Sequence, residues 1–450
     1  MLVEWLPLLL FAVVCALLLL GYPVAFTLGG TALAFAALGI VTGYFEPGWL
    51  NYMPERLSGL IQNQTLIAVP LFVFMGVMLE KTRVAEQLLA NMASLCGALP
   101  GGLGLSVVVV GVLLAASTGI VGATVVTMGL MSLPTFLKHR YDPALATGTI
   151  CATATLGQII PPSIALVLLG DVLSNAYQQA QLNLGVTNPD SVSVGDLFVG
   201  ALLPGVLLAL AYGLYVFLRA SLQPHCAPAV DSNNKIQLKL LFGAIVPPVL
   251  LIVIVLGSII GGVATPTEAA AVGALGALLL AIVKKQLNWT TLTEVCQSTT
   301  HITAKVFMIL IGASLFSLVF RGYGGDETIE HFFTQLPGDV ITAMLIVMVV
   351  IFLLGFILDF IEITFVVVPI VGPILLAMGI NPVWLGVMIA VNLQTSFLTP
   401  PFGFSLFYLR GVAPVEISTA AMYRGVIPFI LIQLLLLLAL AIWPSLVISL

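Results

Sequence analysis

Long apolar runs separated by short polar or glycine- and proline-rich breaks are the dominant pattern of this chain. A run of about 20 apolar residues is long enough to cross the hydrocarbon core of a membrane as a helix. The pattern therefore predicts an all-α polytopic membrane protein with about ten spans, five in each half of the chain. The expected spans are 6–21, 24–42, 61–80, 142–170 and 197–218 in the first half, and 240–260, 266–283, 302–320, 382–410 and 426–448 in the second.

Two further apolar stretches are too long and too interrupted to be single helices. The stretch 103–137 is broken by Ser117-Thr118-Gly119, and the stretch 340–378 is broken around Asp359 to Glu362. Each is predicted to be a re-entrant hairpin. The polar segment 220–239 is predicted to be a cytoplasmic linker between two halves, residues 1–219 and 240–450.

A polar segment with two adjacent prolines interrupts the span 142–170 at residues 155–163, and a similar segment interrupts the span 382–410. A shift of 239 positions superposes four prolines of the first half on four prolines of the second: Pro134 on Pro373, Pro143 on Pro382, Pro161 on Pro400 and Pro162 on Pro401. Five crossings per half give the second half the opposite orientation. Broken helices at corresponding places in two inverted repeats indicate the binding site of a secondary transporter.

The distribution of basic residues predicts the sidedness of these spans. Following the crossings, one face receives twelve Lys and Arg residues and the other receives two, Arg56 and Arg321. Because cytoplasmic loops carry an excess of Lys and Arg, the first face is predicted to be cytoplasmic. Both termini are then exterior, the first hairpin opens to the cytoplasm and the second opens to the exterior. The twelve are Lys81, Arg83, Lys138, Arg140, Arg219, Lys235, Lys239, Lys284, Lys285, Lys305, Arg410 and Arg424.

Composition agrees with this class and excludes others. Hydrophobic residues make up 60% of the chain and charged residues 7%, against about 25% charged residues in soluble domains. Mean hydropathy is +1.18. No run of Lys and Arg suggests a nucleic acid partner, so membrane lipids are the expected surroundings. The five cysteines have no metal-ligand or disulfide-framework spacing.

Five short motifs, taken in their order and spacing, resemble the large membrane subunit of tripartite ATP-independent periplasmic (TRAP) transporters over essentially the whole chain. The motifs are 68–76, 99–103, 157–163, 265–270 and 399–403. The resemblance implies an elevator-type importer in the bacterial inner membrane, driven by a sodium gradient and not an enzyme. It also implies two partners, a small membrane subunit and a periplasmic substrate-binding protein that delivers a small organic acid.

Polar residues at the two breaks are the candidates for substrate binding. Their side chains, and the exposed ends of the broken helices, can hydrogen-bond a carboxylate substrate. The alternative is that they only bridge helices, each such contact contributing about 0.6 kcal/mol. The candidates are Thr124, Thr155, Gln158, Ser163, Asn392, Gln394 and Thr395.

Candidate sodium ligands are oxygen-bearing residues at the hairpin tips and breaks, because hard cations prefer oxygen ligands. By resemblance to the family, Asp359 in the second hairpin binds sodium or stabilises the tip; a water-facing acid is the alternative for Asp359 and for Glu362. Where the family carries Gly-Ser-Ser, this chain has Gly119-Ile120-Val121, so hydroxyl ligands would come from nearby residues. The candidates are Ser117, Thr118, Gly119, Gly157, Pro161, Asp359, Thr399 and Pro400.

Two other patterns bear on structure and function. Thr265-Pro266-Thr267-Glu268 has the spacing of a helix capping box. The segment 171–196 contains acidic residues without Lys or Arg, and is predicted to be an exterior loop that contacts the binding protein.

Two alternative functions were considered. Tyr141-Asp142 and Gly325-Asp326 resemble the aspartate pair of aspartyl intramembrane proteases, but the two acids are expected at opposite faces of the membrane. The nearer alternative to a TRAP subunit is a stand-alone dicarboxylate symporter of similar fold.

Overall fold

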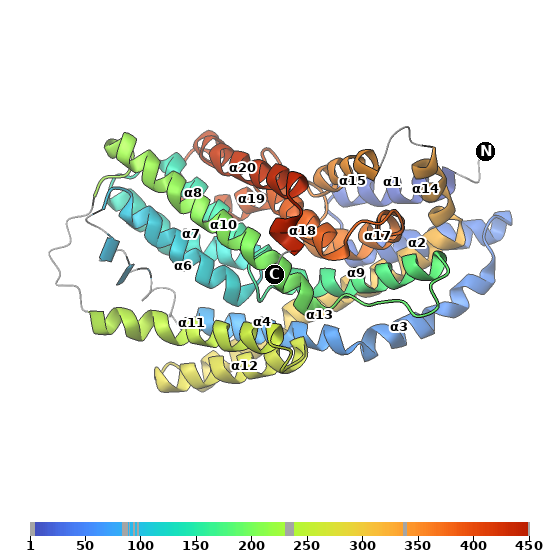
Figure 1. Cartoon of the computed structure of the whole chain (residues 1–450), viewed down its shortest axis with the longest axis horizontal. Coiled ribbons are helices and arrows are strands. Elements are labelled where there is room, and N and C mark those ends of the chain that lie inside the picture. Colours follow the sequence, from blue (N-terminus) through green and yellow to red (C-terminus); the bar gives the residue numbers. More distant parts are fainter. Residues whose placement is uncertain are drawn as a thin grey trace. The chain divides into compact units, whose positions relative to one another are not determined.

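The computed structural model describes residues 5–82, 89, 91–92, 95–96, 99–229, 238–335 and 340–448, and within these ranges it contains helices and no strand (Figure 1). Helices of the first half are α1 (Leu6–Leu19), α2 (Val24–Thr42), α3 (Met53–Gln62), α4 (Gln64–Lys81), α6 (Gly102–Thr118), α7 (Val121–Lys138), α8 (Pro143–Thr155), α9 (Ile164–Asn183) and α10 (Val194–Leu222). Short 3-10 helices are η2 (Pro47–Tyr52), η3 (Leu156–Gln158) and η4 (Pro224–Cys226).

Helices of the second half are α11 (Leu238–Ile260), α12 (Pro266–Val283), α13 (Trp289–Gly322), α14 (Gly325–Thr334), α15 (Val340–Leu354), α16 (Phe360–Val366), α17 (Val368–Ala377), α18 (Pro382–Leu398), α19 (Phe404–Val412), α20 (Thr419–Ile442) and α21 (Ser445–Ile448). The predicted capping box is confirmed at the start of α12, where the Thr265 hydroxyl accepts from the Glu268 backbone and the Glu268 carboxylate accepts from the Thr265 backbone. Each of the two predicted broken spans, 142–170 and 382–410, consists of two helices that flank the Pro-Pro break: α8 and α9 in the first, α18 and α19 in the second.

Seven helices in the described part of the chain are long and apolar enough to cross a membrane, or up to eight if the bent pair α16 and α17 counts as one span. The prediction of an all-α polytopic membrane protein is thereby confirmed. Several expected spans are represented by shorter apolar helices, such as Leu6–Leu19 and Pro382–Leu398. These are shorter because glycine or proline interrupts the apolar run, as it does after Leu398.

The structure corrects three expectations. The exterior loop predicted at 171–196 is helical up to Asn183, because α9 contains no proline and its polar residues continue the helix beyond the apolar part. In the second hairpin the break lies before Asp359, and Glu362 lies within α16 rather than in the break. The predicted linker 220–239 begins inside α10, and its residues 230–237 lie outside the described residues.

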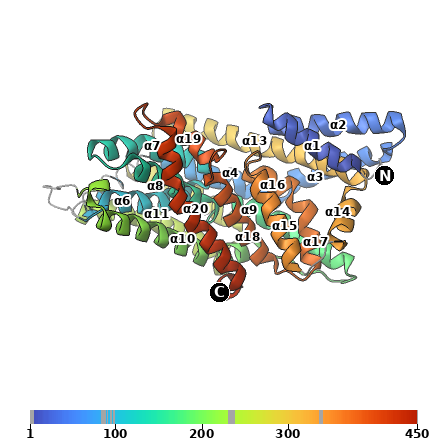
Figure 2. The ribbon, with the colours of Figure 1, turned by 90° about the horizontal axis from the view of Figure 1, so that it is seen from above.

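The chain forms two compact units, and each unit draws on both halves of the sequence. The first contains Met1–Ile67, Leu168–Ser193 and Thr300–Leu385. In this unit α1 and α2 lie along α13 (Figure 2), with the rings of Phe11 and Phe316 6.2 Å apart. A side chain on Gly312 of α13 would collide with the Ala25 backbone of α2. Glycine therefore allows these two helices to pack backbone against backbone.

The second unit contains Ala68–Val167, Val194–Thr299 and Gly386–Leu450 and is built around α8. Helices α6, α7, α10 and α20 pack against α8, and every residue of α8 from Leu145 to Thr155 is buried. The closest approach is between α8 and α20. A side chain on Gly148 would collide with the Gly425 backbone, and one on Gly425 would collide with the Ala144 backbone.

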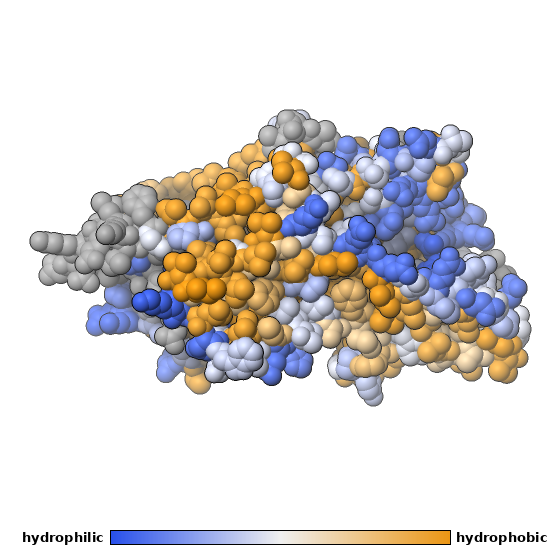
Figure 3. Space-filling model, turned by 90° about the horizontal axis from the view of Figure 1, so that it is seen from below, coloured by the Kyte–Doolittle hydropathy of each residue, from blue (hydrophilic) through white to orange (hydrophobic). Residues whose placement is uncertain are grey.

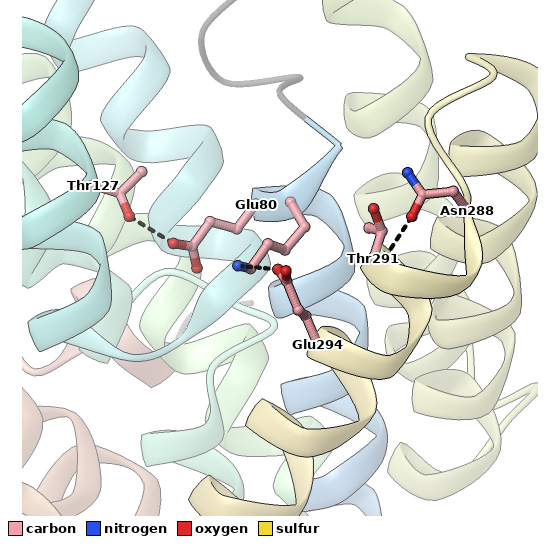
Figure 4. Close-up of polar contacts among 6 residues, drawn as sticks. Glu80, Thr127, Asn288, Thr291 and Glu294 are labelled. Atoms are coloured by element: carbon pink, nitrogen blue, oxygen red, sulfur yellow. Dashed lines mark hydrogen bonds and ion pairs between the residues drawn. The ribbon is translucent and has the colours of Figure 1, made fainter.

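Polar contacts join three helices at one end of this second unit (Figure 4). The Lys81 ammonium group of α4 lies 2.8 Å from the Glu294 carboxylate of α13, and Thr127 of α7 donates a 2.7 Å hydrogen bond to Glu80. Asn288 accepts a 2.7 Å hydrogen bond from the Thr291 backbone at the start of α13. The ion pair is about half exposed, so it contributes little to stability. Its position marks the polar boundary of the apolar helices.

Candidate substrate and ion sites

The first helix break closes with a serine hydroxyl. After Thr155 the chain makes the 3-10 turn η3, and helical structure resumes at Ile164. The Ser163 hydroxyl lies 2.9 Å from the Gly157 carbonyl oxygen and 3.1 Å from that of Gln158. Every residue of this break, Pro161 included, is buried. Non-helical backbone is thus enclosed within protein, as it must be at membrane depth.

The second break also contains a serine hydroxyl that bonds to a backbone carbonyl oxygen; the acceptor corresponds to Gln158 under the shift of 239 positions, whereas the serine lies three positions further along. Helix α18 ends at Leu398 and α19 begins at Phe404. The Ser405 hydroxyl donates a 2.8 Å hydrogen bond to the Phe397 carbonyl oxygen, and Phe397 lies 239 positions after Gln158. In both breaks, therefore, a serine near the start of the second arm bonds to backbone at or just after the end of the first arm. Pro400 is only partly buried, so this break is the more open of the two.

The tip of the first hairpin packs against the first break. Gly119 ends α6 with φ of +61°, a conformation that glycine adopts without strain, and a side chain there would approach the Ile164 backbone nitrogen to 3.0 Å. Gly157 faces Ala115 of the same hairpin. Two predicted cation-site residues, Gly119 and Gly157, are therefore brought together. Ser117 and Thr118 end α6, and their side chains lie outside those described.

A buried polar network connects the two halves within the second unit. Gln394 donates a 3.2 Å hydrogen bond from Nε2 to the Thr155 hydroxyl, and these two residues are 239 positions apart. Gln433 donates a 2.8 Å hydrogen bond to the Tyr212 hydroxyl, which also interacts with Thr155 and Gln394. Two residues at corresponding positions of the predicted halves are thus in direct contact.

Several oxygen atoms of this region are buried and have no hydrogen-bond partner among the described residues. They are the side-chain carbonyl oxygens of Gln158, Gln394 and Gln433. Buried polar atoms are normally satisfied, and exceptions call for an explanation. These three acceptors are suited to a hydrogen-bond donor of a ligand or to a hard cation.

Sequence reasoning missed Tyr212 and Gln433. One signal pointed to Gln433, because it is the single amide in the apolar run 426–442. Tyr212 gave no comparable signal, since tyrosines are common in membrane spans.

The other predicted residues of this unit hydrogen-bond to their own helices. Thr124 donates to the Ile120 carbonyl, Thr395 to Val391 and Thr399 to Thr395, at 2.9, 2.8 and 2.7 Å. Such bonds use the hydroxyl hydrogen and leave oxygen lone pairs available. Asn392 is buried on α18 beside this region of the chain. These four residues stay candidates for substrate or ion binding.

Asp359 belongs to the first unit and is the N-cap of α16. Its Oδ1 accepts a 2.6 Å hydrogen bond from the Phe360 backbone, and Glu362 Oε2 accepts a 2.8 Å bond from the Asp359 backbone. The two acids together form a capping box. This geometry supplies the tip-stabilising role predicted for Asp359 and explains the buried Glu362. The Asp-x-x-Glu spacing was the available sequence signal.

A cavity of about 540 Å³ lies in the first unit. Its wall includes Arg56, Asp171 and Arg321, so both exterior arginines of the predicted topology line it. Asn63 Nδ2 lies 3.1 and 3.0 Å from the two Asp171 carboxylate oxygens. The surface in Figure 3 is hydrophobic over much of its area, with a hollow bordered by hydrophilic residues at the right of the view.

Ion pairing around this cavity is incomplete. Arg321 Nε lies 3.0 Å from the Asp326 carboxylate, and its Nη2 donates to Gln179 at 3.4 Å. Burial raises the pKa of Asp326 and of Asp171, more than the neighbouring Arg321 or Asn63 lowers it. Burial and repulsion from Arg321 lower the pKa of Arg56 more than attraction to Asp326 raises it. In this cavity, therefore, burial disfavours the charged forms of Arg56, Asp171 and Asp326 more than their neighbours stabilise them.

The raised pKa of Asp171 predicts that acidification stabilises the protein. Between the usual pKa of a carboxyl group and the raised one, the folded chain binds a proton that the unfolded chain does not, so stability falls as pH rises through this window. We expect the melting temperature to rise as the pH is lowered toward the usual pKa of a carboxyl group, and to rise less in Asp171→Asn. The exposed Asp190→Asn is the control and should behave as wild type; an equal pH response in Asp171→Asn would contradict the assignment.

Asp142 and Asp326 have structural partners. The Asp142 carboxylate accepts a 3.0 Å hydrogen bond from the Ala144 backbone as the N-cap of α8, and Asp326 pairs with Arg321. They belong to different compact units. Each acid has an ordinary role in its own unit, which gives no support to a protease pair.

Comparison with known proteins identifies the family. Residues 11–446 match the family described as "Tripartite ATP-independent periplasmic transporter, DctM component". The sialic acid TRAP transporter large permease SiaM of Vibrio cholerae is 28% identical, with 95% of this chain and 94% of that protein covered. The C4-dicarboxylate TRAP transporter large permease DctM of Rhodobacter capsulatus is 29% identical, with 91% of each chain covered.

Solved structures support the fold alone. The YdaH transporter of Alcanivorax borkumensis superposes with a TM-score of 0.64 at 16% sequence identity, covering 98% of each chain. MtrF of Neisseria gonorrhoeae superposes with a TM-score of 0.60 at 13% identity, covering 87% of this chain and 82% of that one. With the family match over residues 11–446, the chain belongs to the large permease (DctM) component of TRAP transporters, a family of multi-pass membrane transport proteins and not of enzymes.

Proposed function

We propose that this permease imports a small organic acid across the bacterial inner membrane in symport with sodium. It works with a small membrane subunit and receives its substrate from a periplasmic binding protein. The proposal of an organic acid follows the substrates named for its relatives, sialic acid and C4-dicarboxylates. The family description, a tripartite periplasmic transporter, supports the two partners.

The observation that carries the proposal is the convergence of the two halves at their breaks. Thr155 and Gln394 meet across 239 positions beside buried carbonyl oxygens that have no partner among the described residues. Paired broken helices of this kind hold substrates and coupling ions in secondary transporters. In this mechanism sodium binds to oxygen atoms at the hairpin tips and breaks, and the substrate binds between the two Pro-Pro segments.

Transport then follows an elevator mechanism in which the hairpins and broken helices move as one body. Sodium binding orders the hairpin tips and closes them over the substrate. The two halves are inverted repeats, and both chain termini face the periplasm. This orientation places twelve of the fourteen Lys and Arg residues on the cytoplasmic face.

Uptake into proteoliposomes tests the proposal. With the small subunit and the binding protein present, we expect substrate to accumulate when an inward sodium gradient is applied, and not when potassium replaces sodium. Omitting the binding protein should abolish accumulation. Uptake that persists without either partner would instead identify a stand-alone symporter, and uptake that persists without sodium would exclude sodium coupling.

Sodium should also stabilise the purified permease. A ligand at about 100 times its dissociation constant adds about 2.7 kcal/mol to the free energy of unfolding. We therefore expect a higher melting temperature in NaCl than in KCl at equal ionic strength. Choline chloride at the same concentration is the control for general salt effects, and equal melting temperatures in all three salts would contradict a sodium site in the isolated subunit.

A further inference from the structure

Two arginines that line the cavity of the first unit, Arg56 and Arg321, share one nearby acid, Asp326. Arg56 is half-buried, and within the described part of the chain it makes no hydrogen bond or ion pair that satisfies its guanidinium group. Asp326 attracts Arg56 but forms its ion pair with Arg321. Asp171, which lines the same cavity, is held by Asn63.

Arg56 and Arg321 repel each other across this cavity. Two partly buried cations close together are unfavourable unless anions balance both charges, and Asp326 supplies one negative charge for the two arginines. A guanidinium group presents several N–H donors in a planar fork that matches a carboxylate. A carboxylate-bearing ligand would therefore relieve the repulsion and satisfy donors that the protein leaves available.

The rest of the wall fits a small organic anion. Asn175, Ser314 and Ser317 add polar groups to the cavity, while Leu310 and Phe365 add apolar surface. A volume of about 540 Å³ falls within the range of small-molecule sites. Phe365 lies in the last turn of α16, the helix that Asp359 caps, so the cavity borders the predicted second hairpin.

The two glutamates near Arg56 form no ion pair with its guanidinium group. Arg56 also lines a second cavity of about 980 Å³, together with Glu46, Glu55, Trp49 and Tyr52. No ion pair within 4.0 Å joins Arg56 to either glutamate in the described residues. The first cavity, which holds both arginines, is therefore the better place for an anion.

We infer that Arg56 and Arg321 form a carboxylate-binding site in this cavity, at which the permease receives the substrate anion on the exterior side. This role as a substrate site rests on the proposed import of an organic acid. Binding itself requires neither sodium nor the partner proteins. It is therefore measured independently of transport.

Binding of carboxylates to the purified full-length permease tests the inference. Acetate, succinate and a sialic acid are titrated separately by calorimetry, with inorganic phosphate for comparison. We expect at least one carboxylate to bind, and Arg56→Gln to weaken that binding at least tenfold. Arg56→Lys should bind with intermediate affinity, because lysine keeps the charge but loses the planar fork.

The matched control is Arg424→Gln, which removes an exposed arginine that lines neither cavity. It should leave carboxylate affinity unchanged. The melting temperature of Arg56→Gln should stay close to that of wild type, since the substitution removes both the repulsion from Arg321 and the attraction to Asp326. Weaker binding in a fully folded variant thus reports on the ligand rather than on folding.

Three results would overturn the inference. They are no binding of any carboxylate, equal carboxylate affinity in wild type and Arg56→Gln, and equal or tighter binding of phosphate at the same arginine. Sodium-driven uptake that survives Arg56→Gln without loss of affinity would refute this site and leave the proposed function standing. Arg56-dependent binding without sodium-driven uptake would support the site and refute sodium coupling.

Discussion

Replacing Gly148 by valine is expected to prevent the core of the second unit from packing. A β-carbon at this position collides with the Gly425 backbone on α20, and backbone cannot move aside as a flexible side chain does. Overpacking of a close-packed core costs about 1–3 kcal/mol and sometimes more. Because α8 is buried along most of its length, we expect a loss of about 3 kcal/mol, seen as a lower melting temperature and aggregation during purification.

The control is Gly411→Val, a helical glycine of the same unit with no atom within 4 Å of an added β-carbon. It makes the same chemical change on α19 without a collision. We expect its melting temperature to stay close to that of wild type. A Gly148→Val protein as stable as Gly411→Val would show that α8 and α20 separate without loss of stability, contrary to the close approach described here.

The membrane-spanning helices were predictable from sequence because their length is set by the apolar run. Helix α12 begins and ends at the predicted residues, Pro266 and Val283, since proline and a capping box fix its start. The breaks after Thr155 and Leu398 were predictable from their prolines. In these regions a local signal and the membrane constraint agree.

Helix ends outside the apolar runs were not predictable in the same way. Helix α9 continues through polar residues to Asn183, and α13 begins at Trp289, well before its apolar part. Polar residues are compatible with loops and with solvated or cavity-lining helices alike. What decides between them is tertiary contact, such as that of Asp171 with Asn63, which a single sequence does not contain.

The sequence singled out individual candidate residues, but for most of them it did not indicate which would lie together. The shift of 239 positions aligned Thr155 with Gln394, and these two residues do meet. Charge counting singled out Arg56 and Arg321 as the exterior cations, but gave no reason to expect them in one cavity. They come from α3 and α13, which are far apart in the chain, so only the fold brings them together.

Asp359 combines two roles that one pair of substitutions can separate. Asparagine caps a helix as well as aspartate does, whereas alanine loses the cap at about 0.5–2 kcal/mol. Asp359→Asn should therefore keep the hydrogen bond from the Phe360 backbone and remove the charge. Asp359→Ala should lose both. If Asp359 only caps α16, the asparagine variant behaves as wild type and the alanine variant does not.

If Asp359 also binds sodium, as we expect, the asparagine variant should differ from wild type in its response to sodium. A carboxylate that binds sodium loses most of its affinity as an amide, so Asp359→Asn should melt in KCl as wild type does but lose the sodium-specific stabilisation and at least tenfold of sodium-driven uptake. Glu362→Gln is the control, because glutamine at this position keeps the capping-box hydrogen bond while removing a charge three residues away. The measurements are melting temperatures in NaCl and KCl and uptake with both partners present. Normal sodium dependence in Asp359→Asn would limit Asp359 to its capping role and place the sodium ligands among the oxygen atoms of the first hairpin and the two breaks.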